Sequence, residues 1–486
     1  SMLKHRLGAL SPDQRFALAR RLEAATPDSA RTLAMAPIPK ATPIQSGGRP
    51  PVSVYPASRS QVRMWFIYLL APDSPVYSIP SAWHLQGPLN LPHLESALTA
   101  VVRRHDALRT TFAMDERGVV QRIAAHPEVV LEYHDFSPIA APGNQDAGNR
   151  LLSRQVVQPF NLETGRPFRV ILVRLSPEDH RLLLLMHHIV GDGWSRQNLL
   201  RDLSMSYAAL AAGRPGDLAP LPIQPADIAA WQERRIATDH PDRNEAYWIS
   251  ALAGDLTPLD LPADHPRPAM ITYRGDCRFR PLDPLLRERM ECRAAEEGAT
   301  LFMILLMSFG ILLRRKTGRT DPIVGTPVSG RTRVEMEPLV GYFANTLPLR
   351  LAISHDLSAR ELLRRVRETV LQAQTHQEVP FERLIEQLQV PRDPARHSLV
   401  SVCFRLIESA SPVLQLPGAA ATECDLHTGS SKFDLTFTAD VSGSRWRAMA
   451  EYSTDLFDAH RVDGWLSDWE QLLEHIASNP DQPVRD

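Results

Sequence analysis

Cysteine is scarce in this chain, with four residues among 486. The four are far apart and no two form a CxxC pair, so the sequence predicts neither a structural zinc site nor a disulfide framework. A reduced, cytoplasmic protein is the expectation. None of the four lies in a motif typical of a nucleophile, and we interpret them as small core residues. They are Cys277, Cys292, Cys403 and Cys424.

Long hydrophobic runs are also lacking. The longest, residues 301–313, is interrupted by Ser308 and Gly310 and is followed by three basic residues, so it predicts a buried helix and no membrane span. The formal net charge is only −2, which gives no electrostatic reason to expect a nucleic acid partner. Neither a GxGxxG run nor a GxxxxGKS/T run is present, which argues against nucleotide chemistry within this chain.

The length predicts more than one core. A chain of 486 residues exceeds what a single hydrophobic core supports, so two lobes are expected. Helical and strand patterns alternate from residue 55 onward, which predicts an α/β class. We expect a helix and a proline-rich linker over residues 1–54, a first lobe over 55–222 and a second over 223–486. Ser1 resembles a protease scar before an initiator methionine, so the domain is expected to begin its natural polypeptide.

The most informative feature is an apolar strand, residues 182–188, that ends in two adjacent histidines and an HHxxxDG pattern. Adjacent strand residues point to opposite faces, so only one of His187 and His188 faces a given cleft. The same geometry disfavours a shared metal ion. What remains is one positioned imidazole, a group suited to proton movement near neutral pH. The alternative is two ordinary histidines before an Asp-Gly turn.

Six further segments contain more unusual residues than packing needs. They are SRSQVRMW at residues 58–65, RHDALRTTF at 104–112, IQPADIAAW at 223–231, VGYFANTLPLR at 340–350, HQEVPFE at 376–382 and RDPARH at 392–397. In this order, and together with the HHxxxDG run, they resemble the condensation domains of nonribosomal peptide synthetases. The tail segments KFDL at 432–435 and YSTDLF at 452–457 are similar to that family too.

The resemblance implies an α/β fold of two chloramphenicol-acetyltransferase-like lobes, arranged as a V-shaped pseudo-dimer with a tunnel between them. It also implies amide-bond formation between a donor acyl or peptidyl thioester and a carrier-bound aminoacyl thioester. No cofactor is expected to be bound permanently, because the phosphopantetheine arms belong to the donor and acceptor carrier proteins. The run at residues 479–484 resembles an exit toward a downstream adenylation domain, and a monomer is sufficient.

The resemblance assigns expected roles to residues around the motif. His188 either takes the proton from the amine or hydrogen-bonds the tetrahedral intermediate, and the sequence does not separate these roles. His187 is expected to be its packed or hydrogen-bonded neighbour. Asp192 is expected to hold the turn by pairing with an arginine, for which Arg63 and Arg331 are both candidates.

Gly193 is expected to permit a backbone shape or a close approach that a Cβ would block, and its amide is a candidate donor to the reacting carbonyl. Trp194, Ser195 and Asn345 are the candidates for lining the tunnel. Packing is the alternative for Trp194, and tying a loop is the alternative for Asn345.

The subtype stays open between a domain that elongates an L-configured donor and a starter domain that accepts a fatty acyl group. Epimerization domains usually continue the motif with Val-Ser-Trp-Arg, whereas Trp194 and Ser195 follow here. Two other functions remain as alternatives. One is an inactive condensation-like platform for carrier proteins or tailoring enzymes, and the other is an ester-forming or acyl-CoA-dependent acyltransferase of the same superfamily.

Overall fold

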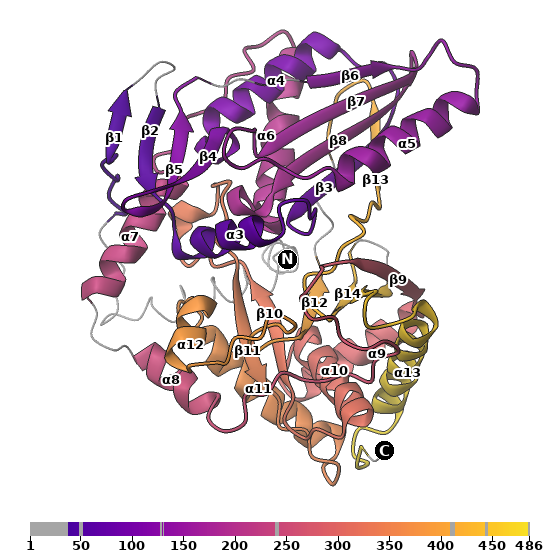
Figure 1. Ribbon diagram of the computed structural model, residues 1–486. Helices are drawn as coiled ribbons and strands as arrows, with labels where there is room; N and C mark the ends of the chain where they lie inside the picture. The colour runs from indigo at the N-terminus through magenta and orange to yellow at the C-terminus, as the bar shows by residue number, and fades with distance from the viewer. Residues whose placement is uncertain are drawn as a thin grey trace, which may run out of the picture. The chain divides into compact units, whose positions relative to one another are not determined.

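The computed structural model (Figure 1) describes residues 37–47, 52–126, 129, 131–238, 243–408, 414–442 and 446–484. They form two compact units, and neither is a single continuous stretch of chain. The first unit takes the chain up to residue 239 together with residues 331–344 and 411–428. The second takes residues 240–330, 345–410 and 429–486. Within residues 1–54, the predicted helix spans residues 3–26, which lie outside the described residues.

The first unit is built on a five-stranded sheet with the strand order β13-β3-β8-β7-β6. Its strands are β13 (Ala420–Cys424), β3 (Ser78–Gln86), β8 (Asp179–His187), β7 (Phe168–Ser176) and β6 (Leu131–Asp135). The central strand β8 pairs antiparallel with both β3 and β7. Its residues 182–186 are almost completely buried, because both faces of this strand are covered. The strand predicted over residues 182–188 is confirmed as far as His187.

Helices of the first unit cover this sheet, and one of them follows strand β8, which ends at His187. Helix α6 (Gly193–Ala211) follows β8 after a short turn, and α4 (Leu91–Arg104) packs against it. Helix α5 (Gly143–Val157) packs against β7 and β8 (Figure 1). Both α4 and α6 begin at a side-chain cap, in which Asn90 accepts from the His93 amide and Asp192 accepts from the Ser195 amide.

A second sheet of the first unit is antiparallel and has the order β1-β2-β5-β4. Its strands are β1 (Gln45–Gly47), β2 (Val52–Pro56), β5 (Gly118–Ala124) and β4 (Thr110–Asp115). Helix α3 (Arg59–Leu70) follows β2 and packs against the turn that carries His188. The proline-rich linker expected within residues 1–54 therefore differs from the structure, because residues 45–47 and 52–54 are strand residues held by ladder hydrogen bonds.

The second unit is a mixed six-stranded sheet with the order β11-β10-β12-β14-β15-β9. Its strands are β11 (Asn345–Arg350), β10 (Ile323–Val328), β12 (Val402–Ile407), β14 (Leu435–Asp440), β15 (Arg447–Ser453) and β9 (Gly275–Pro281). Helices α8 (Arg243–Ala251), α9 (Pro284–Glu296), α10 (Leu301–Thr317), α11 (Ala359–Thr375), α12 (Phe381–Gln387) and α13 (Ala459–Ser478) complete it (Figure 1).

Aromatic side chains join the sheet of the second unit to its helices. Phe309 of α10 stacks on Phe404 of β12 and on Phe437 of β14, with ring centroids 5.4 and 5.1 Å apart. Phe437 also meets Trp469 of α13 edge-on, at 5.0 Å. The helix predicted from the apolar run at residues 301–313 is thus confirmed as a core helix. In the described parts of the chain no single helix is long and apolar enough to cross a bilayer; only α9 and α10 together, bent by 102°, pass that test.

The boundary between the units differs from the one expected at residue 223. Helix α7 (Pro225–Thr238) belongs to the first unit. Gln224 explains part of this, because its amide nitrogen donates to the Arg104 carbonyl (2.9 Å) and its Oε1 accepts from the Asp106 amide (3.2 Å). Ile228 packs with Met336 and Leu339, which lie in a returning segment of the chain. Strand β13 returns as well, and completes the first sheet by pairing with β3.

Candidate active site

The two histidines lie where β8 ends. His187 is the last strand residue, and His188 begins a single 3-10 turn, η2 (His188–Val190). The His188 amide donates to the Tyr77 carbonyl (2.7 Å), and its own carbonyl accepts from the Gly191 amide (3.2 Å). The backbone of His188 is therefore fixed at both polar groups. Strand alternation ends at His187, and the helical turn, instead of the strand pleat, sets the direction of the second histidine.

His187 stabilises the turn and is buried, as expected. Its Nδ1 accepts a hydrogen bond from the Ile189 amide (3.1 Å), so the ring caps the turn that follows it. With Nδ1 as the acceptor, the proton of the neutral ring lies on Nε2. Phe160 meets the His187 ring edge-on, with centroids 5.7 Å apart.

His188 is half-buried, and two tyrosines flank its ring. Tyr77 and Tyr342 each meet it edge-on, with ring centroids 6.1 Å away and ring planes at 88° and 79°. Neither tyrosine was singled out from the sequence. Tyr342 lies within the segment at residues 340–350, which gave a weak signal, whereas Tyr77 lies in a loop before β3 and gave none.

Asp192 is the centre of a buried hydrogen-bond network at the start of α6. Its Oδ1 accepts from the Ser195 amide (2.8 Å), and its Oδ2 accepts from the Phe343 amide (3.1 Å). The Ser195 hydroxyl lies 2.7 Å from Oδ1. Asp192 is only 3 % exposed, so this carboxylate is held by its neighbours and is remote from bulk water. A structural role is the one that this geometry favours.

Arg331 is the arginine that pairs with Asp192. Its two terminal nitrogens donate to Oδ2 at 2.8 Å and to Oδ1 at 3.1 Å, a bidentate arrangement, and its side chain is 1 % exposed. The guanidinium also lies 4.8 Å from the Phe343 ring centroid. Arg63, the other candidate, is a half-buried residue of α3. The ion pair fastens the segment at residues 331–344 to the first turn of α6.

The expectation that Ser195 lines a tunnel is wrong. Ser195 is completely buried, and its hydroxyl serves Asp192 and the backbone of Gly341, so it does not line a tunnel. At Gly193, no atom of its own unit lies within 4 Å of the position that a Cβ would take, and φ is not in the left-handed region. The chain itself therefore does not require a glycine there. Gly193 is exposed, and it leaves open space in front of the helix.

Trp194 and Asn345 are both held by their own units. The Trp194 indole N–H donates to the Glu337 carbonyl at 2.9 Å, which supports the packing alternative. Asn345 belongs to the second unit, where its Nδ2 donates to the carbonyls of Gln377 (3.0 Å) and Val379 (2.7 Å). Its Oδ1 accepts from the Phe381 amide at 3.0 Å. Asn345 thus ties the loop before α12 to the start of β11.

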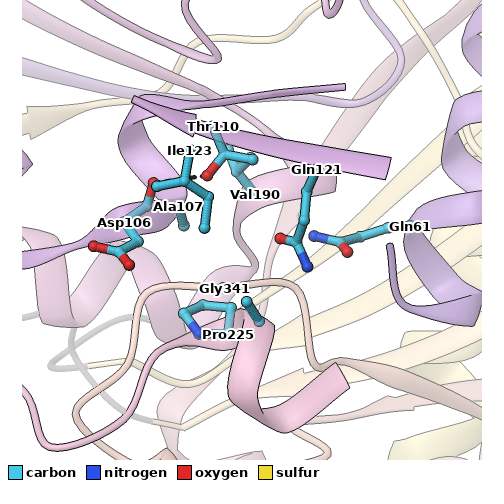
Figure 2. Close-up of a pocket in the computed structure, with 10 residues that line it drawn as sticks. Gln61, Asp106, Ala107, Thr110, Gln121, Ile123, Val190, Pro225 and Gly341 are labelled. Carbon is cyan, nitrogen blue, oxygen red and sulfur yellow. Dashed lines mark hydrogen bonds between the residues drawn. The ribbon is translucent and has the colours of Figure 1, made fainter. Parts of the chain in front are cut away.

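Gln61 is a further residue of the site, which the sequence marked only as part of the motif at residues 58–65. It is 6 % exposed, and its Nε2 donates to the Ile189 carbonyl (3.2 Å) in the turn after His188. Figure 2 shows its carboxamide beside that of Gln121, at the edge of a small cavity that Val190 and Gly341 also line. The volume open to the centre of a water molecule is about 10 Å³, which is enough for one water.

His105 is a buried titratable residue outside the HHxxxDG run. The His105 ring donates or accepts at 2.9 Å from Asp202, and burial lowers the pKa of His105 despite that carboxylate. Burial raises the pKa of the thiols of Cys277 and Cys403 to about 12. Cys403 is buried, whereas Cys277 and Cys424 are half-buried and Cys292 is exposed, so the expected core role is confirmed for Cys403 alone. Among the described residues, no cluster of three or more histidine, cysteine or carboxylate side chains suits a metal ion.

Comparison with known proteins decides the family. The family model described as "Condensation domain" matches residues 52–486, which is most of the chain. The chain belongs to the condensation domain family. Condensation domains catalyse amide-bond formation in nonribosomal peptide synthetases.

Relatives of this condensation domain are parts of large synthetases. The chain is 38 % identical over 432 residues to one of the linear gramicidin synthase proteins of Brevibacillus parabrevis, a match covering 88 % of the chain and 6 % of the relative. It is 36 % identical over 480 residues to the phosphinothricin tripeptide synthetase PhsC of Streptomyces viridochromogenes, covering 98 % of the chain and 43 % of the relative. The chain thus spans a small part of the curated relatives that it matches.

Solved structures share the fold. The X-domain from teicoplanin biosynthesis has a TM-score of 0.82 at 27 % identity, covering 92 % of this chain and 99 % of that one. A second structure of that X-domain, solved in a complex with OxyB, has a TM-score of 0.81 to this chain. The starter condensation domain of the rhizomide synthetase RzmA has a TM-score of 0.77 at 22 % identity, covering 89 % of this chain and 96 % of that one. The α/β fold of two chloramphenicol-acetyltransferase-like lobes is confirmed.

Proposed function

We propose that this condensation domain joins two carrier-bound substrates, with His188 at the reacting atoms. The donor is an acyl or peptidyl thioester, and the acceptor is the free amine of an aminoacyl thioester. Each would be presented on the phosphopantetheine arm of a carrier protein. In the reaction the amine nitrogen forms a C–N bond to the donor carbonyl, the C–S bond breaks, and the donor thiol leaves.

The observation that carries this proposal is that the Asp192 and His187 side chains of the HHxxxDG run have structural hydrogen-bond partners within the protein. Both oxygens of Asp192 are engaged by Arg331, Ser195 and the Phe343 amide, which leaves this carboxylate no part in proton transfer. His187 caps the turn with its Nδ1. His188 is the motif side chain that remains for chemistry, at a half-buried position where the backbone is fixed.

The imidazole needs to supply only part of the rate enhancement. Thioesters are reactive, so alignment of two tethered partners supplies much of the rate enhancement. An α-ammonium group has a pKa of about 7.7 to 8.0, so a substantial fraction of the acceptor amine is free near neutral pH. We infer that His188 orients this amine through a hydrogen bond and takes its proton as the C–N bond forms.

Gly193 supports the same proposal. Its amide is the first of α6 and belongs to the N–H groups that the helix's own carbonyls leave unsatisfied. The positive end of the helix dipole lies there as well. Because nothing in its unit approaches the missing Cβ, we propose that the open space admits substrate and that this amide donates to the developing oxyanion.

The test is a condensation assay read by mass spectrometry, with one carrier protein loaded with leucine and a second loaded with either an octanoyl group or a dipeptide. Amide product from the wild type, and its loss in His188→Ala, is the expected result. Product from the octanoyl donor alone would assign a starter domain, and product from the dipeptidyl donor would assign an elongation domain. Free octanoyl-coenzyme A in place of the loaded donor tests the acyl-CoA-dependent alternative.

A second candidate function is a platform that binds another protein without catalysing condensation. The observation that favours it is the likeness to the X-domain from teicoplanin biosynthesis, which was solved in a complex with OxyB. For this chain the platform predicts no amide product from wild type or from His188→Ala, with either donor. It also predicts that a loaded carrier protein is still retained by the immobilised chain.

A further inference from the structure

We propose that Gln61 is a positioning residue for His188, and that it acts through the carbonyl of Ile189. This inference rests on the proposed function, because it assigns the residue that keeps the reacting imidazole in place. Gln61 belongs to helix α3 and lies 128 residues before Ile189 in the sequence.

The carboxamide of Gln61 is fixed at both ends. Its Oε1 accepts from the Ser58 amide (2.9 Å), while the Ser58 hydroxyl accepts from the Gln61 amide (3.2 Å), which together form the capping box of α3. Its Nε2 donates to the Ile189 carbonyl at 3.2 Å. A donor on one side and an acceptor on the other leave only one orientation of the amide that satisfies both.

The bond to Ile189 completes the support of the catalytic turn. The His188 amide is held by the Tyr77 carbonyl, and the His188 carbonyl by the Gly191 amide. The Ile189 amide is held by Nδ1 of His187. The Ile189 carbonyl is the fourth polar group of these two residues, and Gln61 holds it. His187 and Gly191 belong to the same run of chain as the turn, whereas Tyr77 and Gln61 come from other segments of the first unit, so two separate segments fix the turn from outside.

The hydrogen bond between Gln61 and Ile189 is buried, so its loss is expected to affect the position of the turn. Ile189 is completely buried and Gln61 is 6 % exposed, so bulk water does not replace the donor if Gln61 is lost. The cavity beside the carboxamide is about the size of one water and gives the turn space to relax toward (Figure 2). A displacement of the imidazole by about 1 Å costs on the order of 100-fold in rate. Loss of the bond is therefore expected to lower kcat more than it lowers binding of the carrier proteins.

Gln61→Glu separates positioning from helix capping. A glutamate at this place keeps the capping box, because its oxygen still accepts from the Ser58 amide. It does not donate to the Ile189 carbonyl while it is ionised. When the introduced carboxyl is protonated, its O–H restores the donor, and burial raises the pKa of such a group. Gln61→Met removes both bonds, and Ser58→Ala weakens the cap while it leaves the carboxamide in place.

The experiment measures kcat and the apparent KM for the loaded carrier proteins, from about pH 5.5 to pH 8.5, for the wild type and the three variants. We expect kcat of Gln61→Met to fall by about 10- to 100-fold with little change in KM. The ratio of Gln61→Glu to wild-type kcat should rise as the pH falls, which a purely structural role would not produce. Asp106 lines the same cavity, so the ratio is also measured in an Asp106→Asn background, where no second carboxyl interacts with the introduced one.

Hydrogen exchange of the peptide that spans residues 187–192 gives a readout that needs no turnover. Faster exchange in Gln61→Met and Gln61→Glu, with Ser58→Ala like the wild type, supports the inference even if the chain proves to be a platform. The inference is overturned if exchange in this peptide is unchanged in both Gln61 variants. It is also overturned if an active wild type and Gln61→Met share the same kcat, or if Ser58→Ala loses as much activity as Gln61→Met.

Discussion

Breaking the ion pair between Arg331 and Asp192 is the change that the structure makes most consequential for the first unit. The two side chains are 1 % and 4 % exposed, and two charged hydrogen bonds join them. Arg331→Met removes both bonds and leaves a buried carboxylate with three neutral donors, from Ser195 and the Phe343 amide. Removal of one partner of a buried pair costs about 3–5 kcal/mol, since the remaining charge is uncompensated.

A double-mutant cycle tests this magnitude. Asp192→Asn leaves the guanidinium buried and should cost a similar amount, whereas the double variant contains no unpaired charge. We therefore expect the double variant to be less destabilised than the sum of the two single variants by about 2 kcal/mol or more. Urea unfolding followed by far-UV circular dichroism, with the first unit's transition fitted separately, measures these values. Additive effects, or a cost below about 1 kcal/mol for Arg331→Met, would refute the reasoning.

Three further predictions follow from single contacts. Burial lowers the pKa of His105 against the attraction of Asp202, so the unfolded state binds more protons than the native state. The free energy of unfolding should therefore be unaffected by His105 above about pH 6.5 and should decrease as the pH falls below that value. A plot of Tm against pH should be flatter for His105→Gln. Gly193→Ala should leave the free energy of unfolding unchanged or raise it by up to about 1 kcal/mol, yet lose condensation activity; full activity would remove Gly193 from the site. Ile38 is 4 % exposed in a small cluster of the first unit, so Ile38→Ala should cost about 2 kcal/mol and speed proteolysis around residues 37–47.

Elements with a strong local pattern could be predicted from the sequence. The helix expected from the apolar run at residues 301–313 is α10, with Thr300 as its N-cap and Gly318 in the left-handed conformation at its end. The strand that leads into the HHxxxDG run is also present. In these stretches, apolar periodicity and capping residues point to the same structure that tertiary packing selects.

Contacts between distant segments could not be predicted. Strand β13 has little apolar pattern of its own, and it is a strand because its backbone completes the edge of the sheet beside β3. The division of the chain at residue 223 missed this return, because no local signal states which unit a later segment joins.

Within the site, the adjacent residues were easier to place than the remote ones. The buried role of His187 and the pairing of Asp192 with an arginine follow from neighbouring sequence, but the choice of Arg331 depends on a contact across 139 residues. Ser195 was expected in a tunnel because it follows the motif, yet its position at the third residue of α6 turns its hydroxyl to the capping carboxylate. Gln61 was visible only as one residue of a motif.

The most direct test of the central claim is the single-turnover rate of amide formation for the wild type and for His188→Ala, with the same two loaded carrier proteins. If His188 acts at the reacting atoms, the variant keeps the wild-type Tm and carrier binding while its rate falls by about 100-fold or more. A rate for His188→Ala that stays within about threefold of the wild type, below even the weakest acid–base contribution, would contradict it.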